Sequence, residues 1–178
     1  MEEKQTPLGI HALIYGIGTG LALIVFSLIL YVANLYLNQW LGYVSYLIIL
    51  TGMIVGTLQY RKVQMKGFMT YGKAFSSTFL IALFASIVSI IFFFFYIKYI
   101  NTGFIQELLA QARVKMEAKA GSMSPEDMER AMAWTEKFMS PIWMMVWGFV
   151  GYVFISTILA LLSSIFLQKK DPNAPTMI

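Results

Sequence analysis

The chain has 178 residues, of which 58% are hydrophobic and 12% are charged, and its formal net charge is +4. A soluble domain is usually about a quarter charged, so this composition predicts a membrane protein. Because cysteine is absent, disulfides, thiol catalysis and thiolate metal sites are excluded. The single histidine, His11, excludes a multi-histidine metal site, and we expect it to be an interfacial side chain. No cofactor is expected.

Four uncharged apolar segments, each long enough to cross a bilayer, follow one another along the chain. One crossing takes about 20 apolar residues, and the polar sequence NLYLNQ divides the first long gap between charges into two. The acidic start MEEK and the length of the first apolar run argue against a cleavable signal peptide. Uninterrupted apolar runs predict helices, and the expected spans are 9–33, 40–59, 74–97 and 141–167.

Glycines recur within three of these spans at spacings of three or four residues. Such spacing lets the backbones of membrane helices approach closely, and helix association in lipid depends on this packing. We expect these glycines to pack the spans against one another, and contact with a second copy of the chain is the alternative. The predicted helix-packing residues are Gly16, Gly20, Gly52, Gly56, Gly148 and Gly151.

A short basic connection joins the second and third expected spans. It carries Arg61, Lys62, Lys66 and Lys73, which we interpret as a basic anchor. Lys and Arg in short loops favour the cytoplasmic side, so this connection and both termini are predicted to be cytoplasmic. Tyr and Trp residues gather at the opposite ends of the spans, where the outer interface would lie. Both signals predict the same multi-pass topology.

The sequence GFMTYGKAFSS, from Gly67 to Ser77, resembles the phosphate-binding loop G-x-x-x-x-G-K-[ST]. Ala74 occupies the position of the Mg²⁺-binding hydroxyl, and both flanking segments are expected spans. We therefore expect no nucleotide binding, and the charge placement gives no reason to expect nucleic acid. Gly72 and Lys73 are interpreted as the entry to the third span, and contact with anionic lipid headgroups is a weaker alternative.

Residues 98–140 form the largest part of the chain outside the expected spans. Two amphipathic helices are predicted there, the first ending near Gly121 and the second capped by Ser124 with Pro125 in its first turn. Helices that lie on a membrane usually have a polar face rich in Lys and Arg, and this segment is neutral. An extracytoplasmic hairpin is therefore favoured over two helices that lie flat on the outer leaflet.

The second of these helices has an apolar face at helical spacing. Met128, Met132 and Phe138 belong to it, and we interpret them as a docking face for another membrane component. The six carboxylates of the segment have basic neighbours at helical spacing, which favours a solvated surface over an acid–base pair.

Several features together identify a family likeness. They are a glycine-bearing first span starting near Gly16, a short second span, and a basic linker leading to MTYGKAFSSTF. A charged amphipathic segment before the fourth span and a terminal FLQKKD complete the pattern. The chain resembles a bacterial membrane family known as domain of unknown function 4199. The resemblance implies a four-span inner-membrane protein and supplies no activity or catalytic residue.

The expected fold is all-α: a four-helix transmembrane bundle with an extramembrane helical hairpin, in one integral membrane domain over 1–178. Because the spans contain no Asp, Glu, Lys or Arg, a transporter or pump is disfavoured. We expect a non-enzymatic protein whose partners are the lipid bilayer and another membrane protein or a second copy. The alternative function is the handling of a lipid or small solute in a groove between spans.

Overall fold

The computed structural model describes residues 6–119 and 124–172, which form two units. The first unit contains the chain up to Ser89 together with the chain from Gly151 onward, and the second is Ile90–Val150. Both are helical, and the β-type pairing within these described ranges is a single isolated bridge. The predicted all-α class is therefore confirmed.

Within the described ranges, four helices are long and apolar enough to cross a membrane, as predicted. Their bounds are α1 (Leu8–Val32), α2 (Gln39–Val63), α3 (Tyr71–Phe95) and α6 (Pro141–Leu167), and α3 continues into a π-helical turn, η1 (Tyr96–Ile100). Some ends differ from the expected spans by several residues, since α2 continues to Val63 and α3 begins at Tyr71. Arg61 and Lys62 consequently lie in the last turn of α2, where positive charge offsets the negative end of the helix dipole.

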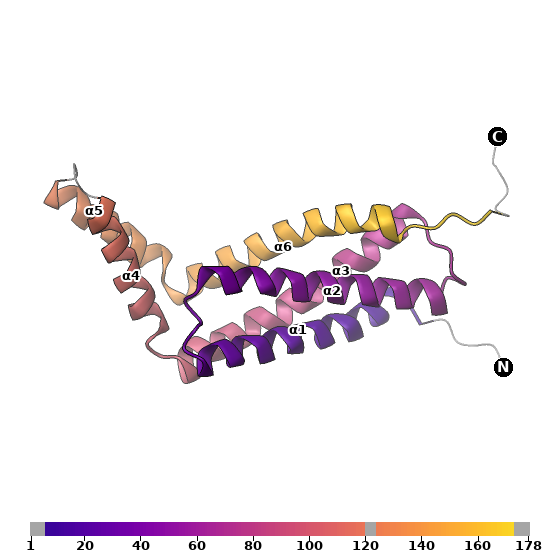
Figure 1. Ribbon diagram of the computed structural model, residues 1–178, viewed down its shortest axis with the longest axis horizontal. Helices are drawn as coiled ribbons and strands as arrows, with labels where there is room; N and C mark the ends of the chain where they lie inside the picture. The colour runs from indigo at the N-terminus through magenta and orange to yellow at the C-terminus, as the bar shows by residue number, and fades with distance from the viewer. Residues whose placement is uncertain (1–5, 120–123, 173–178) are drawn as a thin grey trace. The chain divides into compact units, whose positions relative to one another are not determined.

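Contacts in the first unit bring four helix ends together. Figure 1 shows the start of α1, the end of α2, the start of α3 and the end of α6 at the same end of the first unit. This arrangement is held by hydrogen bonds from Thr6 N to Gln64 Oε1 (2.9 Å), from Arg61 Nη1 to Leu167 O (2.8 Å), and by the two 2.8 Å backbone bonds between Met69 and Lys169. Successive long helices therefore run in opposite directions.

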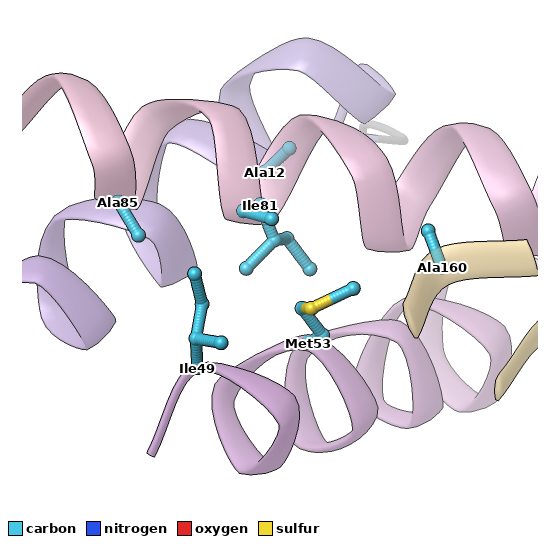
Figure 2. Packing of buried hydrophobic residues seen from close by; sticks show 7 residues of the cluster. Ala12, Ile49, Met53, Ile81, Ala85 and Ala160 are labelled. Atoms are coloured by element: carbon cyan, nitrogen blue, oxygen red, sulfur yellow. The ribbon is translucent and has the colours of Figure 1, made fainter. Parts of the chain in front are cut away.

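Small and large apolar side chains alternate in the core of the first unit. Ala12, Ala85 and Ala160 are fully buried on three different helices, and Figure 2 shows Ile81 of α3 directed toward Ile49 and Met53 of α2. Small residues let membrane helices approach closely enough for such side chains to interlock. The outer surface instead carries large apolar residues that are more than half exposed: Ile14, Leu47 and Phe154. This distribution is the one expected of helices surrounded by lipid.

The second unit contains the two helices predicted between the third and fourth spans, α4 (Phe104–Lys119) and α5 (Pro125–Phe138). The Ser124 cap is confirmed, because its Oγ accepts a hydrogen bond from the backbone N–H of Asp127 at 3.2 Å. The Gly121 cap lies outside the described residues. The projection of these helices from a membrane stays a prediction.

The start of α4 is tied to the end of α3 by a buried polar contact. Asn101 Nδ2 donates to the hydroxyl oxygen of Tyr96 at 3.1 Å, and both residues are buried. The ring of Phe104 meets Tyr96 edge-on at 6.0 Å. These contacts hold the first turn of α4 against η1.

Candidate functional site

Four of the six predicted packing glycines lie at close approaches between helices of the first unit. A Cβ at Gly16 would contact Cβ of Phe84 and would lie 2.9 Å from the carbonyl oxygen of Ile81. A Cβ at Gly20 would lie 2.8 Å from Cβ of Val88. Real Cβ atoms do not approach other atoms so closely, so these positions of α1 require glycine if α3 is to stay in place.

The two glycines predicted in α2 lie against α1 and α3. A Cβ at Gly52 would meet the side chain of Thr19, and one at Gly56 would lie 2.6 Å from Cδ1 of Ile81 and 2.9 Å from Cγ of Tyr15. The glycines of α1 and α2 therefore allow α1, α2 and α3 to pack closely against one another.

The packing role of the two glycines of α6 stays a prediction. A Cβ at Gly148 or Gly151 would meet nothing within 4 Å among the residues that the structure describes. Spacing alone suggested both positions, but the face of α6 that packs in the first unit carries Ser156, Ala160 and Ser164 instead. The orientation of α6 about its axis decides which small residues meet a neighbour.

His11 is buried against neighbouring helices, and its expected position at the membrane interface stays a prediction. Its exposed fraction is 8%, and its Nε2 lies 2.8 Å from the carbonyl oxygen of Gly56. The imidazole stacks on Tyr15 at 4.6 Å and meets Tyr60 at 5.0 Å. Among residues 6–119 and 124–172, no three His, Asp or Glu side chains gather as a metal site requires.

The basic anchor contains one partly buried arginine and three exposed lysines. Arg61 donates from Nη1 to the last carbonyl oxygen of α6, at Leu167, and so caps that helix. Lys62, Lys66 and Lys73 are exposed. The connection turns through a left-handed backbone at Gly67, whose φ is +88°, and it therefore links two long helices rather than forming a strand before a phosphate loop.

The predicted docking face is divided between two sides of α5. Met132 is buried at 8% exposure, whereas Phe138 is 48% exposed and stacks on Trp134. Six residues separate Met132 from Phe138, which places them about 120° apart around a helix. Met128 and Met132 line a cleft that does not include Phe138, and the docking role of the three residues stays a prediction.

The methionine side of α5 lines a cleft against α4. The cleft has a volume of about 680 Å³. On α4, Arg113 and Glu117 form a pair at 4.0 Å beside it. The residues that line it are Arg113, Glu117, Met128, Glu129, Arg130, Met132, Ala133 and Glu136.

An apolar groove of about 580 Å³ lies between α1 and α2 in the first unit. The two threonine hydroxyl groups of its lining bond within their own helices, since Thr19 Oγ1 donates to Tyr15 O and Thr51 Oγ1 to Leu47 O, both at 2.8 Å. Gly18 lies in the groove and has no neighbour within 4 Å of a built Cβ. The groove can therefore hold an apolar chain, and it offers few polar groups.

Four apolar helices of membrane-spanning length, packed through small residues, indicate a multi-pass membrane protein. The family model described as protein of unknown function (DUF4199) matches residues 14–169, and the chain belongs to this family. The match includes α2, α3, α4, α5 and α6 and most of α1. No curated protein matches the chain, and no solved structure matches it.

Proposed function

We propose that the protein is a non-enzymatic membrane protein that docks another membrane protein in the cleft between α4 and α5. The cleft itself is the observation that supports this function, because it combines an apolar floor with charged walls. Met128 and Met132 provide the floor, and methionine adapts to varied apolar side chains. Confinement in one membrane raises the effective concentration of a partner, so a small interface suffices.

The proposed occupant is an amphipathic helix of the partner, next to its own membrane span, with basic residues flanking an apolar face. Arg113 and Glu117 already pair with each other, and Glu129 and Glu136 outnumber Arg130 on the remaining wall. This acidic excess favours a basic partner segment, because complementary charges steer and align interfaces.

Site-specific photo-crosslinking tests the docking proposal. A benzophenone amino acid at Met128 is expected to give a discrete adduct with another membrane protein, whereas one at exposed Val114, outside the cleft, gives none. Adding Glu136→Lys should lower the Met128 adduct about tenfold, since like charges across an interface are unfavourable. Equal adducts from both positions, or adducts with lipid alone, would contradict the proposal.

The same proposal includes the topology: a bacterial inner membrane, with the α2–α3 connection and both termini in the cytoplasm. It is supported by the exposed lysines of that connection. The chain lacks cysteine, so Lys62→Cys and Lys115→Cys each introduce a single thiol. An impermeant maleimide applied to cells is expected to label only the Lys115→Cys variant. Labelling of Lys62→Cys alone would indicate the opposite orientation in the membrane. Labelling of both variants would contradict the proposed topology.

A second candidate function is the handling of a lipid or small apolar solute, and the α1–α2 groove favours it. Gly18→Phe fills the groove from an open position, and Gly9→Phe places the same side chain at another open position of α1. If the groove carries this function, Gly18→Phe lowers the amount of lipid that remains bound after purification in mild detergent, and Gly9→Phe does not. Mass spectrometry of the intact protein measures both.

A further inference from the structure

A row of exposed aromatic side chains runs from α5 to the start of α6 within the second unit. Trp134 and Phe138 stack at 6.2 Å, and Phe138 meets Trp143 at 6.3 Å. These three side chains are 59%, 48% and 41% exposed, respectively. Lys137 Nζ lies 5.4 Å from the centre of the Trp134 ring. Large aromatic side chains this exposed normally mark an interaction surface.

The row is continuous with the exposed apolar surface of α6. The first two turns of α6 carry three further exposed apolar residues. Their exposed fractions are 74% for Ile142, 44% for Val146 and 56% for Trp147. These residues belong to a candidate membrane span. The start of a membrane span is surrounded by lipid. The same lipid would therefore border Phe138 and Trp134.

The chemistry of the row matches the boundary between lipid and water. Indole rings concentrate at that boundary because they combine a large apolar surface with one N–H donor. A lysine beside them can bury its methylene groups and keep its ammonium group in water.

The end of α3 repeats this combination independently. Lys98 Nζ lies 5.5 Å from the Phe94 ring and 5.4 Å from the Tyr99 ring, and Tyr99 is 65% exposed. The end of the third candidate span and the end of α5 thus each carry a lysine against exposed aromatic rings.

We propose that the Trp134, Phe138 and Trp143 face binds the lipid surface and holds the C-terminal half of α5 in the headgroup layer. The proposal rests on α3 and α6 spanning a bilayer. The described part of α5 carries four acidic residues against two basic ones, so the binding is apolar in origin and is expected with zwitterionic lipid. Met132 and the cleft lie on another side of α5, so lipid binding leaves the cleft accessible to a partner.

Fluorescence quenching in vesicles tests this inference. The chain has four tryptophans, Trp40, Trp134, Trp143 and Trp147, and replacing the other three with Phe leaves Trp134 as the single reporter. In phosphatidylcholine vesicles brominated near the headgroup, this variant is expected to lose about half its fluorescence, because the indole lies at interfacial depth. Lipids brominated near the chain ends should quench it less.

Two matched variants separate this inference from the proposed membrane topology. A single-Trp147 variant reports on the span, and a tryptophan-free chain with Val114→Trp reports on exposed α4. If Trp147 is quenched but Trp134 is quenched no more than Val114→Trp, the lipid-binding face is overturned and the membrane span is retained. Absence of quenching for Trp147 as well would overturn the spanning topology itself.

Discussion

In the unit that ends at Ser89 and resumes at Gly151, helices approach until Gly16 and Gly56 leave no room for a Cβ. In the unit Ile90–Val150, α4 and α5 instead leave a cleft of about 680 Å³ between them. The difference teaches that packing in the first unit depends on glycines, which have no side chain. The arrangement of the second unit depends on the side chains that α4 and α5 carry. Added atoms should therefore damage the first unit most, whereas the second should respond to local losses.

The largest expected effect comes from adding one methyl group at a close approach. Gly16→Ala should lower the free energy of unfolding by about 3 kcal/mol, because the new Cβ overlaps Phe84 and the Ile81 carbonyl. Gly18→Ala, two residues away and open, should leave stability unchanged or raise it by about 0.5 kcal/mol through helix propensity. Unfolding by a denaturing detergent, followed by circular dichroism, measures both. Equal losses at both positions would refute the packing difference.

A smaller effect is expected from the contact between the end of α2 and the end of α6. Arg61→Met removes the part-buried hydrogen bond to Leu167 O and should cost about 2 kcal/mol, as for other hydrogen bonds that involve a charged group. Lys62→Met changes an exposed neighbour with the same charge and should cost less than about 0.5 kcal/mol. The same unfolding assay compares the two, and a larger loss for Lys62→Met would contradict this prediction.

In the second unit, removal of the Ser124 cap should have a local effect. Ser124→Ala should destabilise α5 by about 1 kcal/mol, because the Asp127 N–H loses its acceptor. Ser124→Asp retains an acceptor and should restore stability. Hydrogen exchange should become faster in residues 125–138 and stay unchanged in α1 and α2. Faster exchange throughout the chain would show that the two units unfold together.

The smallest expected effect belongs to a hydroxyl pair in the first unit. Thr57 Oγ1 donates to Ser77 Oγ at 3.0 Å, and both residues are fully buried. A double-mutant cycle with Thr57→Val and Ser77→Ala should give a coupling energy of about 0.6 kcal/mol, the average for hydrogen bonds between membrane helices. Thr51→Val changes an exposed hydroxyl group that bonds within its own helix, and it should show no coupling to Ser77. A coupling energy larger than the loss of stability in Gly16→Ala would contradict the order of effects predicted here.

Local sequence patterns were sufficient for the helices and for one of their caps. The four long apolar segments and the Ser124–Pro125 helix start depend on residues within a few turns of each other, so each could be predicted without knowing its neighbours. The ends of the helices are predicted less accurately. Charge places Arg61 and Lys62 in the connection, whereas they lie in the last turn of α2. Helices tolerate basic residues well in their last turn.

The amino-acid sequence by itself determined how many apolar helices the described chain forms, where they lie along it, and that small residues are available to pack them. Only the tertiary structure decided which small residues meet a neighbour, so in the first unit Gly16 is enclosed and Gly151 is open. It also buried His11 and separated Met132 from Phe138. The physical reason is that helical spacing defines faces, whereas the rotation of each helix about its axis depends on the shape of the helices packed against it.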